Sequence, residues 1–421
     1  MKFVYGSKMK LAFIVSLIAV SFNAERAAAI EFVNDAGLIS ALKKNRMLSE
    51  KDLTAISSEY PKLEVWGNFQ FQYLYAADSG ANKQNEFDLL HANLMLVGRV
   101  TDKVSMFIEP EFGQGVPSIR DAYIVYKPYG FGIYAGNHRV PFSAEAMQND
   151  VNLRFAERNL GSLISPDRMM GISVAKNMFN EKAMVQVGIW NSRINSNAEV
   201  DLINNRLADS QIFSSGSSGT GNNIFIRAFR IGSLSQGQSG FYSRGNGFSE
   251  SENFNKETNF DWGVSFFDSA SATTGNVSPA VTALNGVNAY EADLSFGFRS
   301  ISAEIEYAER TIDWWQYNPF AVSTPVSSVQ NSFSAQASAL LTENLSFALR
   351  LDSFVYDGKG KVLKGALGQD QDNWTTVGVN YYLKEHNTKV QLNYTLKKES
   401  MPTGMASPKN DTMLIQATTY F

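Results

Sequence analysis

The chain ends in the stretch MLIQATTYF, residues 413–421, where Met, Ile, Ala, Thr and Phe alternate with Leu, Gln, Thr and Tyr. A period of two is the repeat of a β-strand, because successive side chains point to opposite faces of the sheet. One face of this segment is apolar and closes with an aromatic ring. The pattern therefore predicts a terminal strand with one apolar and one wetter face.

The same alternation recurs along the chain from Leu63 onward. In residues 344–356, for example, Phe347 and Leu349 alternate with Ala348 and Arg350. Many such strands, with aromatic residues near their ends, favour a barrel that has lipid outside and water inside. We expect about sixteen strands, near residues 63–77, 87–101, 103–112, 118–127, 130–139, 168–176, 181–190, 223–232, 258–270, 287–299, 301–312, 329–341, 344–356, 371–384, 387–399 and 410–421.

The connections between these strands alternate, over most of the chain, between very short turns and longer polar loops. Short periplasmic turns and long extracellular loops are the known asymmetry of outer-membrane barrels. An even strand count then places both ends of the barrel on the periplasmic side. One connection, residues 232–257, is long where a short turn is expected. It is either an extended periplasmic connection or an additional hairpin, which would raise the count to eighteen.

The two ends of the chain agree with an exported barrel. Residues 1–29 combine a basic start, a short apolar run and an Ala-rich cleavage site, which is typical of a signal peptide cleaved near Ala29. The terminal aromatic, Phe421, resembles the end of bacterial outer-membrane barrels that the barrel assembly machinery reads. We therefore expect a bacterial outer-membrane protein in contact with lipids and lipopolysaccharide.

Composition narrows the function further. Without residues 1–29 the chain has 33 basic and 40 acidic side chains, a net charge of −7, which disfavours a nucleic-acid partner. The chain contains no Cys, so disulfides and thiolate metal sites are excluded. After the signal peptide, no uninterrupted apolar run is long enough for a membrane-spanning helix. No cofactor is implied.

Residues 30–62 differ from the strands that follow. Leu38, Leu42 and Leu53 belong to a set of apolar residues at roughly helical spacing, and residues 49–52 resemble a helix-start capping box. We expect a short helical segment on the periplasmic side, before a barrel that comprises residues 63–421.

The connection after the fifth expected strand, residues 139–168, mixes apolar and charged residues, unlike the Ser- and Gly-rich loop near residues 191–222. Such an amphipathic loop is suited to fold into the barrel and pack on its inner wall. It would then narrow the lumen and place charges at the constriction.

Three motifs in this region carry a resemblance to a known family. They are GNHRVPF at residues 136–142, LRFAER at 153–158 and PDRMMG at 166–171. These resemble the pattern of the phosphate-selective porin O and P family: a strand ending in G-x-x-[KR]-x-P-F, an F-x-E-R element and a strand opening with P-x-R-x-x-G. The resemblance implies a sixteen-stranded trimeric porin that passes anions, in some members selectively phosphate.

Phosphate-selecting members of that family use Arg and Lys along the lumen, which suit phosphate because they form charge-assisted bonds to its oxygens. The loop supplies four candidates for substrate binding at the constriction: Arg139, Arg154, Arg158 and Arg168. The loop also holds four acids, so Arg158 and Arg168 are equally suited to be salt-bridged pins between loop and wall. Arg139 and Arg154 are the better candidates for contact with solute. The loop acids are Glu145, Asp150, Glu157 and Asp167.

The strand pattern also places charges on the lumen-facing side of the expected strands. The basic candidates are Arg310, Arg350, Lys389, Lys397 and Arg99, and the acidic ones are Asp261, Glu304, Glu306, Asp352, Glu109 and Glu111. This mixture does not fix the sign of the preferred ion.

Enzymatic chemistry is not indicated. The chain has three His, and none lies in a recognised hydrolase, metalloprotease or nucleotide-binding motif. We expect a porin, and by the resemblance a homotrimer, for passive diffusion of small solutes with a preference for anions such as phosphate. A non-specific or cation-preferring porin is one alternative, and a secreted β-rich adhesin or solenoid without a pore is another.

Overall fold

The computed structural model describes residues 30–31, 61–76, 85–113, 117–180, 182–193, 223–233, 258–270, 283–316, 324–358, 371–384, 387–400 and 410–420. The signal peptide, residues 32–60 of the helical segment expected before the barrel, and Phe421 lie outside the described residues. Residues 30–31, at the start of the expected helical segment, form a short strand instead. Among the residues that are described, no helix combines the length and apolar character needed to cross a membrane.

The described part of the chain is almost entirely antiparallel β-structure. Its strands are β1 (Ile30–Glu31), β2 (Lys62–Ala76), β3 (Asn85–Arg99), β4 (Val104–Glu111), β5 (Ser118–Tyr126), β6 (Phe131–Arg139), β7 (Arg168–Met178), β8 (Ala183–Arg193), β9 (Asn223–Ser233), β10 (Asn259–Ala270), β11 (Ala283–Phe298), β12 (Ile301–Gln316), β13 (Thr324–Thr342), β14 (Leu345–Gly358), β15 (Gln371–Lys384), β16 (Thr388–Ser400) and β17 (Thr412–Tyr420). Three short helical turns, α4 (Ala144–Met147), η1 (Asp150–Asn152) and η2 (Leu160–Leu163), lie between β6 and β7.

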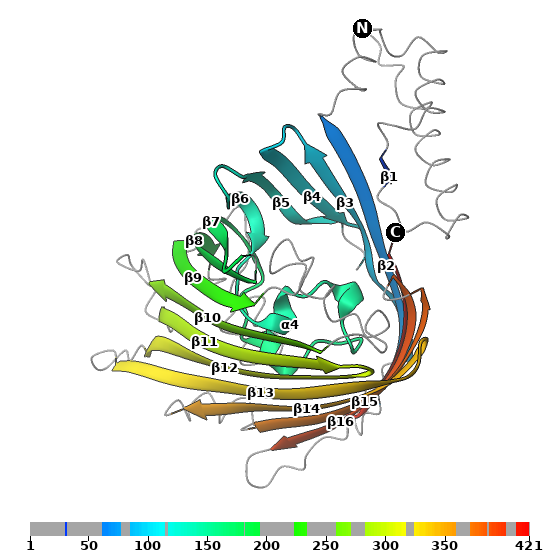
Figure 1. Ribbon diagram of the computed structural model, residues 1–421. Helices are drawn as coiled ribbons and strands as arrows, with labels where there is room; N and C mark the ends of the chain where they lie inside the picture. The colour runs from blue at the N-terminus through cyan, green and yellow to red at the C-terminus, as the bar shows by residue number, and fades with distance from the viewer. Residues whose placement is uncertain are drawn as a thin grey trace, which may run out of the picture.

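The sheet closes on itself (Figure 1). Strands β2 to β17 pair in sequence order, and β17 returns to pair with β2, with Gln416 opposite Gln72. The described residues therefore form a closed barrel of sixteen strands, and β1 adds only two residues beside β2. A closed barrel also excludes the solenoid alternative.

The eighteen-stranded alternative is wrong. Strands β9 and β10, which precede and follow the long connection at 232–257, pair directly with each other, with Phe229 opposite Phe266. Because these two strands are hydrogen-bonded neighbours, no further hairpin stands between them in the barrel wall.

The alternating pattern is an inside-out one, as β14 shows. Phe347, Leu349 and Leu351 are 47%, 41% and 49% exposed on the outer face, whereas Arg350 and Asp352 are buried on the inner face. Exposing apolar side chains on this scale is unfavourable in water and favourable against lipid. The outer surface thus suits a hydrocarbon environment.

Turn chemistry fixes two of the short connections. Tyr129 and Gly130 join β5 to β6, and Phe179 and Asn180 lie between β7 and β8, all with positive φ. Asn and Gly tolerate this backbone region better than other residues, and tight hairpins require it. Because β6 and β7 are antiparallel neighbours, these two turns lie at the same end of the barrel.

The segment between β6 and β7, residues 140–167, is called the inner loop below. Figure 1 shows α4 of this loop inside the ring of strands. Side chains and backbone groups of the loop contact β12–β16 on one side and β3–β5 on the other. One connection therefore crosses the interior of the barrel and touches both sides of its wall.

Candidate functional site

Local sequence shapes the strand that leads into the inner loop and caps two of the short helices within the loop. Gly136, in β6, has a φ of 133°, and a Cβ there would lie 2.3 Å from the backbone oxygen of Ala122, so only glycine fits. Ser143 caps α4 by accepting a hydrogen bond from the backbone N–H of Ala146 at 3.2 Å. Asn159 caps η2 in the same manner, at 2.9 Å from the N–H of Ser162.

An apolar cluster holds the start and end of the inner loop against the wall. Phe142 is fully buried and meets Phe267 of β10 edge-on, with ring centroids 4.8 Å apart. Leu160 and Ile164 join the same cluster, together with Trp190 of β8. Burying an aromatic ring of this size contributes roughly 1.5–3 kcal/mol. The cluster therefore anchors the loop without using charge.

A network of buried polar groups anchors the middle of the loop to β12 and β13. Glu306 of β12 accepts hydrogen bonds from the hydroxyl of Ser143 and, at 3.2 Å, from the side-chain amide of Asn159. Gln336 of β13 donates to the Glu145 carboxylate at 3.0 Å, and the backbone N–H of Asn159 donates to the same group at 3.3 Å. All five side chains are buried, so each bond is protected from water.

The strands β14 and β16 hold the backbone of the loop. Lys389 donates from Nζ to the carbonyl oxygen of Leu153 at 2.6 Å, and Arg350 donates from Nη1 to that of Glu157 at 2.7 Å. The Arg350 guanidinium also lies 4.7 Å from the centroid of the Phe155 ring, a cation–π distance. These two lumen-facing cations thus contact the loop.

Two further predicted residues contribute to the same side. Arg154 donates to the hydroxyl of Ser302 at 3.1 Å and lies 3.9 Å from the Glu304 carboxylate. Arg310 of β12 donates to the carbonyl oxygen of Leu163 at 3.4 Å. The loop is therefore fastened to the β12–β16 wall at many points between Ser143 and Leu163.

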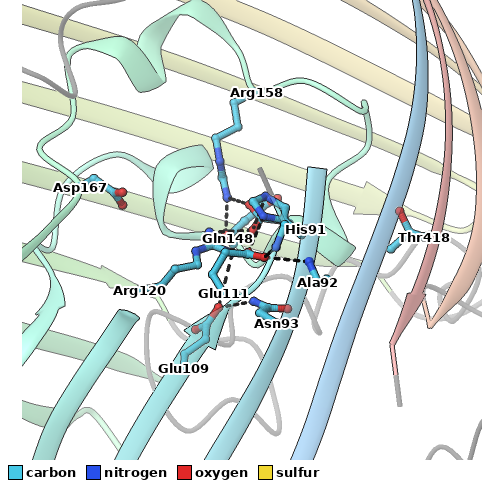
Figure 2. Close-up of polar contacts among 12 residues, drawn as sticks. His91, Ala92, Asn93, Glu109, Glu111, Arg120, Gln148, Arg158, Asp167 and Thr418 are labelled. Atoms are coloured by element: carbon cyan, nitrogen blue, oxygen red, sulfur yellow. Dashed lines mark hydrogen bonds and ion pairs between the residues drawn. The ribbon is translucent and has the colours of Figure 1, made fainter. Parts of the chain in front are cut away.

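The opposite side of the loop meets β3–β5 through ionised groups (Figure 2). Asp150 lies 2.9 Å from Nη2 of Arg120 in β5 and 2.5 Å from Nη2 of Arg158. The Nε2 atom of His91 in β3 lies 3.5 Å from the same carboxylate, while its Nδ1 atom lies 2.8 Å from Glu111 of β4. The Asp150 carboxylate therefore contacts three basic side chains, those of Arg120, Arg158 and His91.

Burial and neighbouring charges shift the pKa of Asp150 in opposite directions. Burial by itself would raise the pKa of Asp150, but the nearby charges of Arg120 and Arg158 outweigh it and hold the pKa well below its usual value. Asp150 is consequently a permanent anion at any ordinary pH.

Arg139 and Arg168 face each other across the base of the loop, as register partners at the ends of β6 and β7. Arg139 is buried and donates from Nη1 to the carbonyl oxygens of Ala146 at 2.7 Å and Gln148 at 2.8 Å. Arg168 lies 2.8 Å from the carboxylate of Asp121 in β5. Both side chains therefore have structural contacts.

These arginines nevertheless surround a cavity of about 200 Å³. Arg120, Arg139, Arg158 and Arg168 line it, and Asp167 is the acidic side chain among its lining residues. Asp150 holds Arg120 in place, and Asp121 holds Arg168. The result is a space with four guanidinium groups in fixed positions, next to the point where β6 ends and β7 begins.

The predicted site residues thus separate into two groups. Arg139, Arg158 and Arg168 are brought together at the cavity. Arg154 lies on the β12–β16 side with Arg310, Arg350 and Lys389, and none of these four is among the residues that line the cavity. Lys397 lies apart from both groups, with its Nζ atom 4.3 Å from the centroid of the Trp374 ring.

Sequence reasoning missed Arg120 and His91 as members of the site. Arg120 stands at the start of a short strand, where a single charge is typical of a solvated strand end. A lone His within a strand is ordinarily a filler. The available signal was position, because both residues belong to strands that precede the amphipathic loop along the chain.

A second charged region lies on the inner face of β9–β12. Arg230 of β9 is buried, with Nη1 2.7 Å from Glu291, and it also contacts Asp293. Among the described residues, the buried acids of these strands outnumber the buried arginines, Arg230 and Arg310. The acids are Asp261, Glu291, Asp293, Glu304 and Glu306. This wall is therefore electrostatically different from the arginine-lined cavity.

Comparison with known proteins bears on the fold and on part of the sequence. The family model described as Phosphate-selective porin O and P matches residues 63–221, which confirms the family resemblance noted in the sequence. No curated protein sequence matches the chain.

Several solved structures share the fold. The outer membrane channel DcaP of Acinetobacter baumannii is 13% identical with a TM-score of 0.56, over 87% of this chain and 99% of that chain. OmpF of Salmonella typhi, in a complex with daunomycin, is 12% identical with a TM-score of 0.54, over 86% and 98%. The trimer form of OmpT, an outer membrane protein of Vibrio cholerae, is 10% identical with a TM-score of 0.52, over 85% and 99%.

At these identities the structures establish the fold, and the family model adds the sequence pattern of the inner loop and its flanking strands. The chain is a closed, sixteen-stranded outer-membrane β-barrel of the porin type, and over residues 63–221 it has the sequence pattern of the phosphate-selective porin O and P family.

Proposed function

We propose that this protein is a passive diffusion porin with a preference for small anions, with phosphate and similar oxyanions as candidate substrates. The observation that carries the proposal is the cavity of about 200 Å³ lined by Arg120, Arg139, Arg158 and Arg168. Arginine binds oxyanions through charge-assisted, often bidentate hydrogen bonds. No cofactor or energy source is part of the proposal.

The fixed positions of the guanidinium groups support this function. Arg168 is held by Asp121 and Arg158 by Asp150, so neither side chain has to be ordered when an anion arrives. A binding group that is already ordered loses less conformational entropy on binding. The inner loop, which stays attached to β12–β16, would present these groups to permeating solute.

A second candidate is a cation-preferring porin. It is favoured by the acidic inner wall, where Asp261, Glu291, Asp293, Glu304 and Glu306 are all buried on β10–β12. If the diffusion path follows this wall rather than the arginine cavity, cations would be concentrated in the pore. The two candidates predict opposite signs of the same electrical measurement.

The test is the reversal potential of the purified protein in a planar bilayer under a KCl gradient, repeated with added phosphate. A chloride-selective current that phosphate reduces supports the anion-preferring porin. A potassium-selective current supports the second candidate instead. Arg158→Gln should weaken the block by phosphate, whereas Lys103→Gln, in the exposed turn after β3, is the matched control and should leave it unchanged.

The remaining expectations concern assembly. We propose export through cleavage of residues 1–29, insertion that depends on Phe421, contact with lipid and lipopolysaccharide, and a homotrimer. The trimer form recorded for OmpT of Vibrio cholerae supports the last of these. Analytical ultracentrifugation in detergent, with the bound detergent subtracted, measures the number of chains in the particle.

A further inference from the structure

Asp150 occupies an unusual position between the cavity and the wall. Its side chain is 12% exposed and lies at the start of η1, where the inner loop meets β3 and β5. Its carboxylate contacts Arg120 from the wall and Arg158 from the loop, at 2.9 Å and 2.5 Å. Two of the four arginines that line the cavity are therefore paired with one loop carboxylate.

Other carboxylates near the cavity are engaged differently. Asp121 and Asp167 both contact Arg168, at 2.8 Å and 3.2 Å, so that arginine has two acidic partners. Removing either acid leaves Arg168 paired with the other. Asp150 is the one carboxylate in contact with Arg158 among the described residues. Arg120 also lies 3.4 Å from Glu109 and 3.6 Å from Glu111, so the removal of Asp150 acts most strongly on Arg158.

We infer that Asp150 determines the ion selectivity of this pore, by setting how much of the positive charge of Arg120 and Arg158 acts on permeating ions. This inference rests on the proposed function, because it assumes that solute passes within reach of the arginine cavity. Neutralising Asp150 leaves two guanidinium charges with less compensation beside the cavity. The local concentration of anions then rises and that of cations falls.

The size of the effect follows from focusing in a narrow, low-dielectric space. A charged cleft changes local counter-ion concentration by roughly 10-fold or more. Part of that change is screened by salt, because the Debye length is about 10 Å at 0.1 M. We therefore expect at least about a threefold rise in the chloride-to-potassium permeability ratio at 0.1 M KCl.

The test compares three variants with the wild type in the reversal-potential measurement, after heat-modifiable migration on a gel has shown that each barrel is folded. Asp150→Asn keeps the size of the side chain and removes its charge, and should give the threefold rise. Asp167→Asn makes the same chemical change at the same cavity, but the Asp167 side chain is 63% exposed and its charge is screened by solvent, so its shift should be clearly smaller. Asp150→Glu keeps the charge and should retain the wild-type ratio.

The outcomes separate this inference from the proposed function. An unchanged ratio in Asp150→Asn overturns the inference, and so does an equal shift in Asp167→Asn. A rise in conductance to both ions at an unchanged ratio also overturns it, since that result shows only a loosened loop. The sign of the wild-type reversal potential tests the proposed anion preference separately. If the wild type is potassium-selective but the chloride-to-potassium permeability ratio still rises threefold in Asp150→Asn, the inference about Asp150 is supported and the anion preference is withdrawn.

Discussion

The two sides of the inner loop meet the barrel by different kinds of contact. Toward β12–β16, the loop is held by hydrogen bonds among buried side chains and by donors such as Lys389 to its backbone carbonyl oxygens, and the buried ring of Phe142 packs on nearby β10. Toward β3–β5, the contacts run through Asp150 to Arg120 and His91. One side is a broad anchor in which ion pairs, such as Arg154 with Glu304 at 3.9 Å, are a minor part, and the other is a small set of ion pairs.

This contrast shows how one connection can be both fixed and responsive. Apolar burial and hydrogen bonds to backbone groups depend little on salt or on mild changes of pH. Ion pairs are weakened by salt, although pairs that are partly buried are screened less than exposed ones. The anchor thus determines where the loop is, and the charged side determines how the pore treats ions.

Breaking the apolar anchor should have the strongest consequence. Phe142→Ala removes a fully buried ring and should weaken attachment of the loop by about 3–5 kcal/mol. We expect single-channel conductance to rise and the loop to become sensitive to protease. Phe347→Ala, at an exposed position on the outer face, is the matched control and should change neither property. Equal conductance in Phe142→Ala and the wild type would show that the cluster does not hold the loop.

The polar part of the anchor is expected to matter less. The side-chain oxygen of Asn393 accepts a hydrogen bond from the buried backbone N–H of Ala156 at 2.7 Å. Asn393→Leu leaves that donor unpaired, at a cost of about 1–3 kcal/mol. Open-channel current noise should therefore increase, to the same extent in 0.1 M and 1 M KCl. Asn393→Asp keeps the acceptor oxygen, so its open-channel current noise should stay at the wild-type level. Increased noise in both variants would argue against a role for this hydrogen bond.

The charged side should respond to salt. Raising KCl from 0.1 M to 1 M shortens the Debye length from about 10 Å to about 3 Å. Screening then weakens the contacts of Asp150 with Arg120 and Arg158 in part, because partly buried pairs are screened less than exposed ones. We expect current noise in the wild type to grow with salt, and this growth to be absent in Asp150→Asn. A salt response that survives in Asp150→Asn would place its origin elsewhere in the barrel.

Changes of pH should affect Asp150 least. Because its folded pKa lies below the value of about 3.9 for an unperturbed Asp, the stabilisation it supplies is complete above that value and is lost as pH falls through the folded pKa. The reversal potentials of the wild type and of Asp150→Asn should thus differ equally from pH 8 to pH 5, and converge only below about pH 4.

The cleanest form of this pH series has His91→Gln in both proteins, so that the imidazole next to Asp150 does not titrate in the same range. The neighbouring charges that remain are Arg120, Arg139, Arg158 and Glu111. Convergence between pH 6 and pH 5 would contradict a strongly stabilised carboxylate.

Much of the fold was predictable because a period of two leaves a strong signal. In β14, the alternation of Phe347, Leu349 and Leu351 with buried polar residues defined both faces of the strand before any contact was known. The gaps between the expected strands, at residues 128–129 and 177–180, coincide with turns that contain the positive-φ residues Tyr129 and Asn180. The sixteen-strand count followed from the pattern, except at residues 232–257, where direct pairing of β9 with β10 removed the larger alternative.

The site was predictable only in part. The sequence pointed to the inner loop and to Arg139, Arg158 and Arg168, which do surround one cavity. It also favoured Arg139 as a contact for solute, whereas the structure shows its Nη1 atom bonded to two backbone carbonyl oxygens. Its role toward solute remains a prediction.

Local periodicity and local composition were sufficient to specify the barrel, its inside-out faces and the loop that carries charge. Which charges compensate one another depends instead on the closed fold. Arg120 and Asp150 are thirty residues apart in the chain, and their 2.9 Å contact exists because the closed sheet brings β5 beside a loop that folds inward. The energy of such a pair depends on a separation of a few ångströms, and no local pattern in the sequence encodes so precise a distance.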